Sequence, residues 1–130
     1  MINLKELLAK LLDAVKVDYI VEQGTSGIWT YRKWNSGVCE LWGKWEETLS
    51  NYSTASPLYG YMSSTKNLPF TVYDPVVSYI VKVGTGFAMP ASGMGSIDTS
   101  TLNQIKGYAM GTANGSNATI WSFYVKGTWK

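Results

Sequence analysis

Apolar residues follow a helical period only near the start of the chain. Between residues 3 and 16, leucine and valine recur at spacings of three and four, which places them on one face of a helix. Asn3 is suited to cap this helix, and Glu6 completes a capping-box pattern three residues later. We therefore expect residues 1–17 to contain a short N-terminal amphipathic α-helix. Its apolar ridge consists of Leu4, Leu8, Leu11 and Val15.

This apolar ridge must pack against another apolar surface, because a helix of this length has only marginal stability by itself in water. One alternative is that the ridge packs on the chain's own β-domain. The other is a two-heptad bundle between copies of the chain, with Leu4 and Leu11 at d positions and Leu8 and Val15 at a positions. Two heptads are too few for the pattern to decide between these alternatives.

From residue 18 onward, the pattern is one of short strands that end in turns. The clearest pair covers residues 28–34 and 38–45, joined by a loop whose Gly37 can take the positive-φ position of a hairpin. Residues 84–96, rich in glycine and small side chains, are expected to form a long exposed loop. Further strands are expected at residues 17–21, 58–63, 70–73, 76–83, 102–110 and 118–129.

Seven or eight strands with no helix between them predict a mainly β fold. We expect an antiparallel β-sandwich, jelly-roll-like, over residues 18–130, preceded by the short N-terminal α-helix. The chain has 130 residues, which suits one domain of this kind. A domain of this size buries a smaller fraction of its surface than a large one, so burial between subunits would add to its stability.

Composition narrows the range of partners. The net charge is +2 and there is no basic run, so the chain lacks the charge pattern of a nucleic-acid-binding protein. No stretch approaches the length of a membrane span, so membrane insertion is not expected. The start of the chain does not resemble a signal peptide, and the single cysteine, Cys39, excludes an intramolecular disulfide. We therefore expect synthesis in the cytoplasm.

The sequence also limits the chemistry. It contains no histidine, which removes the commonest general base and the commonest transition-metal ligand. We therefore expect no enzyme activity, no cofactor and no metal. Glu40, Glu46 and Glu47 lie near tryptophans and would suit a glycosidase pair, but solvent-facing strand charges are the far commoner explanation.

Six tryptophans and nine tyrosines are the strongest indication of function. Alternation places Trp29 and Tyr31 on one face of their strand and Trp34 on the other, so the rings cannot all enter one core. Exposed aromatic rings stack on the apolar faces of sugars, although a core or interface position is more common for any single residue. The candidate ligand-binding residues are Trp29, Tyr31, Trp34, Trp42, Trp45, Tyr59 and Tyr61.

Several segments of the β-region form a recognisable set of motifs. They are 19–24 (YIVEQG), 27–34 (GIWTYRKW), 36–37 (SG), 39–43 (CELWG), 67–71 (NLPFT), 75–77 (PVV) and 124–130 (YVKGTWK). These segments resemble parts of phage tail-fibre and receptor-binding proteins. The resemblance covers most of residues 19–130, with the order of residues altered in the stretch CELWG. Its motifs are framework motifs, so it carries over no binding residue.

This resemblance implies a β-sandwich head domain at the distal end of a viral fibre or baseplate appendage. It implies a homotrimer in the virion that attaches to a host cell-surface carbohydrate and contacts other virion proteins. Three copies of residues 3–16 would then form a coiled-coil bundle, and the avidity gained from three weak sites would be on the order of 10².

Two further points stay open at this stage. Most such heads terminate a longer chain, whereas this one is preceded by its own helix, so the chain is either a small virion protein or a fragment of a fibre. The alternative function, from a different class, is a purely structural virion protein without a ligand, such as a head fibre, a decoration protein or a connector.

Overall fold

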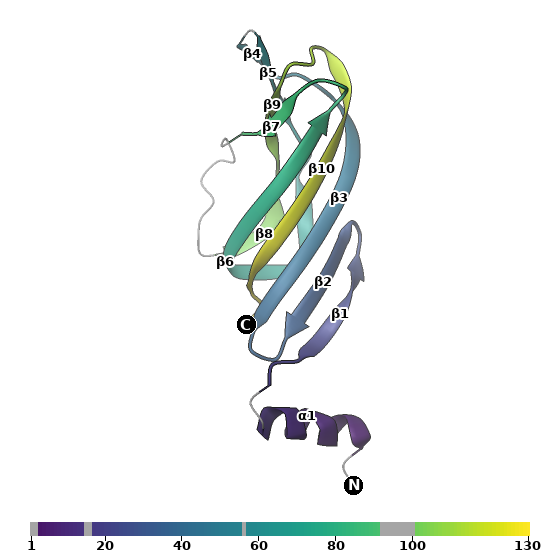
Figure 1. The fold of residues 1–130 in the computed structure, drawn as a ribbon, viewed down its shortest axis with the longest axis vertical. Helices are drawn as coiled ribbons and strands as arrows, with labels where there is room; N and C mark the ends of the chain where they lie inside the picture. Colours follow the sequence, from purple (N-terminus) through teal and green to yellow (C-terminus); the bar gives the residue numbers. More distant parts are fainter. Residues whose placement is uncertain (1–2, 15–16, 56, 92–100) are drawn as a thin grey trace.

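The computed structural model describes residues 3–14, 17–55, 57–91 and 101–130. These residues form one helix, α1 (Leu4–Ala14), and ten strands in two antiparallel sheets (Figure 1). The predicted fold class is therefore confirmed: the chain is an antiparallel β-sandwich preceded by a short N-terminal helix.

A large sheet of six strands forms most of the molecule, with a small sheet of four strands at the end far from α1 (Figure 1). In spatial order, the large sheet contains β1 (Ile20–Ser26), β2 (Trp29–Trp34), β3 (Val38–Ser50), β10 (Ser116–Thr128), β6 (Lys66–Val83) and β8 (Thr101–Ile105). The small sheet contains β4 (Ser53–Ala55), β5 (Leu58–Met62), β9 (Tyr108–Gly111) and β7 (Ala88–Pro90).

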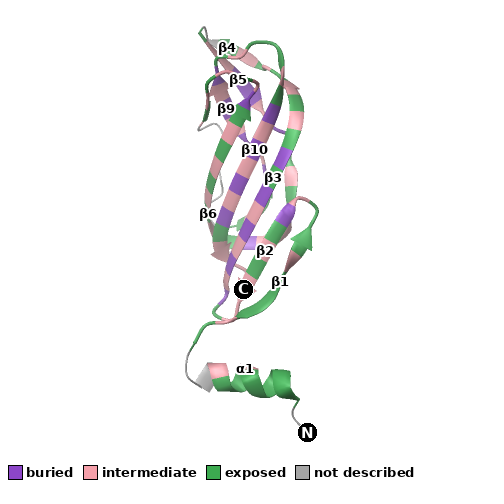
Figure 2. Cartoon of the chain, turned by 45° about the vertical axis from the view of Figure 1, so that its right-hand side comes forward, coloured by how far each residue is buried: buried purple, intermediate pink, exposed green. Residues whose placement is uncertain are grey.

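The centre of the large sheet is an unbroken ladder between β3 and β10. Pairing runs without a register shift from Val38 opposite Thr128 to Ser50 opposite Ser116. Side chains alternate between the two faces, and Figure 2 shows this as alternating buried and partly buried residues along both strands. Odd-numbered residues therefore point into the sandwich, and even-numbered residues point outward.

The core is built from the inward side chains of this ladder. On β10, the Phe123 ring stacks between Trp45 (5.4 Å between centroids) and Tyr79 (4.5 Å). Apolar side chains from β5 and β9 of the small sheet and from β6 and β8 of the large sheet also enter the core. The other buried apolar residues are Trp29, Cys39, Leu41, Tyr61, Leu68, Val72, Val83, Ile105, Ala109, Trp121 and Val125.

The predicted hairpin is confirmed. β2 pairs with β3 over residues 29–33 and 39–43, and the connecting Gly37 has φ 101° as expected. The Gly37 N–H donates to the Trp34 carbonyl, and the Gly37 carbonyl accepts from the N–H of Trp129. The C-terminal end of β10 is thereby tied to the turn.

The predicted break at Asp74 is wrong. Residues 66–83 form one strand, β6, which bends where Asp74 takes φ 49°. Before the bend, β6 pairs with β8, and after the bend it pairs with β10; Tyr73, just before the bend, pairs with both strands. Pro75 therefore marks a change of partner within one strand, and it does not end the strand.

The predicted strand over residues 102–110 is also wrong, because β8 and β9 lie in different sheets. The chain crosses between the sheets at Gly107, where a Cβ atom would lie 2.5 Å from the Trp121 ring. Only a residue without a side chain fits so close to that ring. The periodicity of the sequence cannot indicate this contact, because the contact involves Trp121 on a strand distant in sequence.

Two other boundaries differ from expectation. The first strand begins at Ile20 and continues through Gly24, and the turn comes at Gly27 with φ 59°. The expected loop over residues 84–96 contains strand β7, which pairs with β9. Residues 92–96 lie outside the described part of the chain.

The N-terminal helix has the predicted cap, because the Glu6 N–H donates to Asn3 Oδ1 at 2.8 Å. α1 lies beyond the end of the sandwich (Figure 1), and its ridge is open to solvent. Leu4, Leu8 and Leu11 are 81%, 54% and 62% exposed. The ridge therefore does not pack on the chain's own sheets, while Val15 lies outside the described residues. No helix in the described ranges has the length and apolarity to cross a membrane.

Candidate functional site

The outward face of the large sheet carries two neighbouring aromatic rings. Antiparallel pairing aligns Trp42 of β3 with Tyr124 of β10, and places Ser78 of β6 next in the same row. The centroids of the two rings lie 5.8 Å apart, with 54° between their planes. Both side chains are partly exposed. We call Trp42 and Tyr124 the aromatic platform.

A groove of about 460 Å³ opens beside the platform. In the next row of the sheet, Ser122 of β10 lies between Lys44 of β3 and Ile80 of β6. The short side chains of Ser78 and Ser122 leave a depression between their longer neighbours. The residues that line the groove are Ile28, Thr30, Trp42, Gly43, Lys44, Ser78, Tyr79, Ile80, Ser122, Phe123 and Tyr124.

Two charged side chains hold the platform in place. The Arg32 guanidinium lies 5.3 Å from the centre of the Trp42 ring, a cation–π contact. Glu40 accepts a short hydrogen bond from the Tyr124 hydroxyl. This bond, together with burial and the charge of Glu40, raises the pKa of Tyr124 to about 12. The hydroxyl is thus held in the protonated form that donates this bond, and the contacts with Arg32 and Glu40 orient both rings in the absence of a ligand.

The chemistry of the groove suits a saccharide. The two rings offer an apolar surface on which the apolar face of a sugar can stack. The hydroxyls of Thr30, Ser78 and Ser122 can each donate and accept a hydrogen bond, as a polyhydroxylated ligand requires. No carboxylate lines the groove. The lining therefore contains no pair of carboxylates of the kind that glycoside hydrolysis uses.

The three glutamates considered for a glycosidase pair do not come together. Glu40 and Glu46 lie on the same face of β3 but six residues apart, which corresponds to roughly 20 Å along a strand. A catalytic pair needs about 5–10 Å between carboxyl groups. Glu47 lies on the opposite face of β3, so it cannot pair with either of them there.

Glu47 has a structural role at the end of β3. Its carboxylate accepts hydrogen bonds from Trp45 Nε1 (2.8 Å) and from the Ser64 N–H (2.9 Å). Burial alone would raise the pKa of this carboxyl, but these bonds and the charge of Lys66 outweigh burial. The pKa of Glu47 is therefore lowered, and the charged carboxylate links β3 to the segment before β6.

Three of the candidate aromatic residues are core residues, so their assignment to ligand binding is wrong. Trp29, Trp45 and Tyr61 are 2%, 8% and 0% exposed, so a surface ligand cannot reach them. Trp29 Nε1 donates to the Asn67 carbonyl (2.8 Å), and the Tyr61 hydroxyl donates to the Ala113 carbonyl. Alternation along their strands directs these side chains inward, where burial of large aromatic groups stabilises the fold.

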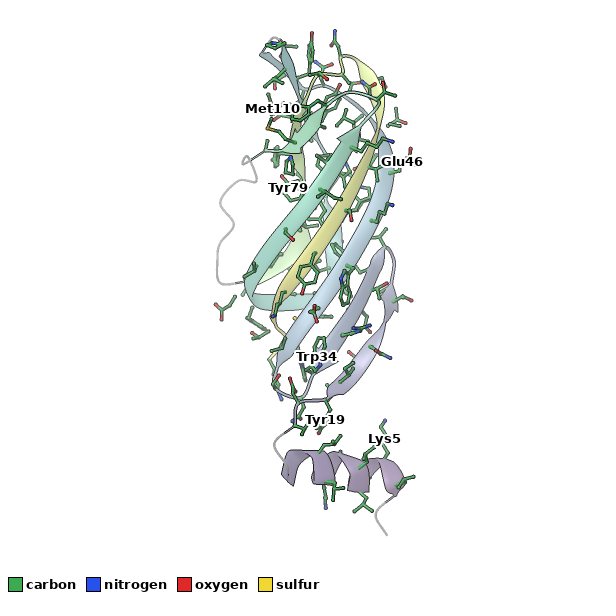
Figure 3. All side chains as sticks on the ribbon, in the orientation of Figure 1. Lys5, Tyr19, Trp34, Glu46, Tyr79 and Met110 are labelled. Atoms are coloured by element: carbon green, nitrogen blue, oxygen red, sulfur yellow. The ribbon has the colours of Figure 1, made fainter. Side chains whose placement is uncertain are left out.

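Three others are partly buried and lie outside the groove. Tyr31 makes an edge-to-face contact with Phe70 (5.4 Å between centroids), and Tyr59 packs against the core. Trp34 lies at the end of the large sheet near α1 (Figure 3). Of the seven candidates, only Trp42 belongs to the groove.

Tyr124 was missed among the candidate residues, although the sequence contains a signal for it. Alternation in the last strand places Trp121 and Phe123 on one face and Ser122 and Tyr124 on the other. Once β10 is known to pair with β3, that second face becomes the continuation of the Trp42 row. The missing information was the long-range pairing.

In the residues that the structure describes, no three acidic or cysteine side chains are placed to hold a metal ion. No family model matches the chain, and neither a curated protein nor a solved structure matches it.

Proposed function

We propose that this protein is a phage attachment protein: a non-catalytic, carbohydrate-binding head, homotrimeric through its N-terminal helix, that binds a host cell-surface glycan. The observation that carries the proposal is the aromatic platform beside a groove lined with hydroxyl groups. The virion context and the trimer come from the resemblance of residues 19–130 to tail-fibre and receptor-binding proteins.

The placement of the platform supports binding rather than packing. The row that contains Trp42 and Tyr124 is flanked by Thr30 and Ser78, which are small and exposed. The platform therefore covers no core, and the fold gains little from large rings at these positions. Large, preordered aromatic surface next to hydroxyl groups is typical of binding surfaces.

The helix supports an oligomer. An 11-residue helix is shorter than the length that is stable alone in water, and α1 exposes an unbroken row of leucines. In an oligomer, the leucine ridges of other copies of the chain would pack against this ridge, because the leucines occupy heptad positions. Such a bundle would place several grooves on one particle, which raises avidity for a surface that displays many copies of a glycan.

The test is glycan binding by the intact protein and by two variants. Trp42→Ala should weaken binding by about tenfold or more, which corresponds to about 1.4 kcal/mol, because the stacking surface is lost. Trp34→Ala, a tryptophan on the same sheet but outside the groove, should bind as the wild type does. Absence of binding to every glycan on an array, or full binding by Trp42→Ala, would refute the proposal.

A purely structural virion protein is the second candidate function. The observation in its favour is that Val76 and Ile80, also on the outward face, are 68% and 71% exposed. A neighbouring virion protein that covered these residues would also cover the groove. This candidate predicts no glycan binding, together with loss of particle assembly in Ile80→Asp.

A further inference from the structure

We infer that the groove binds an anionic saccharide, with the sugar ring on the aromatic platform and its carboxylate or phosphate at Lys44. This inference rests on the proposed function and adds the chemical class of the ligand.

The charge of the groove is the first argument. Lys44 is the only charged residue among those that line it. Its side chain is exposed, and the one ion pair in the described ranges joins Lys33 to Glu22 on another part of the molecule. The ammonium group of Lys44 is therefore available to a ligand. Glu46, two residues further along β3, is the nearest carboxylate on that face of the strand and is not part of the lining.

The sheet face around the groove also carries a net positive charge. On β2, β3, β10 and the part of β6 after its bend, the outward-facing charged residues comprise four cations and two carboxylates. One of the carboxylates, Glu40, is already hydrogen-bonded to Tyr124. An approaching anion therefore meets a net positive surface, which favours encounter. These residues are Arg32, Glu40, Lys44, Glu46, Lys82 and Lys126.

The position of Lys44 relative to the platform is the second argument. Trp42 and Lys44 are two residues apart on one face of β3, which places their Cα atoms roughly 7 Å apart. This separation matches a sugar that stacks on the indole and directs an exocyclic acid group towards the ammonium. Ser122, opposite Lys44, offers a hydroxyl to the same acid group.

The third argument is what the lining lacks. A neutral sugar presents many hydroxyl hydrogens, and carboxylate or amide oxygens are strong acceptors for them. The lining contains neither of these side-chain types, and its polar side chains are Thr30, Ser78, Ser122, Tyr124 and Lys44, together with the core residue Tyr79. The groove is therefore better matched to a ligand that itself supplies strong acceptors.

The test is an array of matched glycan pairs probed with the intact protein. Each acidic glycan, a uronate or a sugar phosphate, is printed beside the methyl ester or the dephosphorylated form of the same glycan. We expect at least tenfold preference for the acidic member in low salt. The preference should shrink in molar salt, where charges are screened within about 3 Å.

Two variants connect the preference to one side chain. Lys44→Gln should abolish the preference, so that the acidic glycan binds no more tightly than its neutral partner. Lys82→Gln removes a positive charge from the same face outside the lining, and should keep the preference.

The outcomes separate this inference from the proposed function. Equal binding of both members of each pair, or an unchanged preference in Lys44→Gln, overturns the anionic ligand and leaves a glycan-binding head. Failure to bind any glycan of either kind overturns the proposed function, and the inference with it.

Discussion

At the scale of single residues, the hydrogen bond between Tyr124 and Glu40 determines how the platform responds to pH. The Tyr124 pKa of about 12 lies above the ordinary tyrosine pKa of 10.0, so folding favours the protonated hydroxyl. A group with a raised pKa contributes its full stability below its unfolded pKa. That contribution is lost as pH rises from about 10 through 12.

We predict that Glu40→Gln lowers the pKa of Tyr124 towards its ordinary value, because the carboxylate acceptor is removed. In an ultraviolet titration of tyrosinate, one tyrosine should then ionise at lower pH than in the wild type. Tyr79, whose pKa is raised by burial in the core, is an internal control and should not move. An identical titration curve for the variant and the wild type would contradict the assigned bond.

The same variant should also weaken ligand binding slightly, since the Tyr124 ring loses its fixed position. The expected loss is small because the ring itself remains. This residue-scale effect differs from that of Trp42→Ala, which removes a stacking surface.

At the scale of elements, the bend in β6 is the feature with the clearest energetic signature. Asp74 has φ 49°, in the left-handed region that β-branched residues avoid. Aspartate tolerates this region because its short polar side chain can hydrogen-bond locally, and glycine adopts it without a steric cost. The bend allows one strand to pair with both β8 and β10.

We predict that Asp74→Val destabilises the fold by about 1–2 kcal/mol, whereas Asp74→Gly is neutral to within about 0.5 kcal/mol. Urea denaturation followed by tryptophan fluorescence measures both. Because Asp74 is exposed, lost packing does not complicate the comparison. Equal stability of the valine and glycine variants would show that the bend does not require this backbone conformation.

Most elements could be predicted from the sequence because their signals are local. The capping pattern at Asn3 and the glycine at position 37 gave the helix and the hairpin. The bend at Asp74 and the crossing at Gly107 could not be predicted, because each depends on strands distant in sequence. The site shows the same division: alternation separates Trp42 from Trp45, but only the pairing of β3 with β10 shows which face is inside.

At the scale of the whole molecule, the helix and the groove lie on separate parts of the structure. α1 lies beyond one end of the sandwich (Figures 1 and 2). The groove is lined by residues of β2, β3, β6 and β10 in the large sheet. No residue of α1 lines the groove, so a substitution in the helix leaves the groove residues unchanged. We therefore expect that assembly and ligand binding can be altered independently.

We predict that the protein is an oligomer in light scattering and that Leu8→Asp is a monomer, because the substitution places a charge in the centre of the exposed ridge. Lys10→Gln, on the polar side of the helix, should leave the oligomer intact. The monomer should bind a soluble glycan as well as the wild type does, but bind a glycan-coated surface on the order of 10² more weakly. A monomeric wild-type protein would exclude the helical bundle.

The buried position of Cys39 limits the reactivity of its thiol. The thiol is fully enclosed by the sandwich, and burial raises its pKa to about 11, so almost no thiolate exists at neutral pH. Oxidants and alkylating reagents react with accessible thiolate. In the intact fold, the Cys39 thiol is neither accessible to these reagents nor ionised. A particle that carries this protein into oxidising surroundings would therefore gain no covalent sulfur links between its copies.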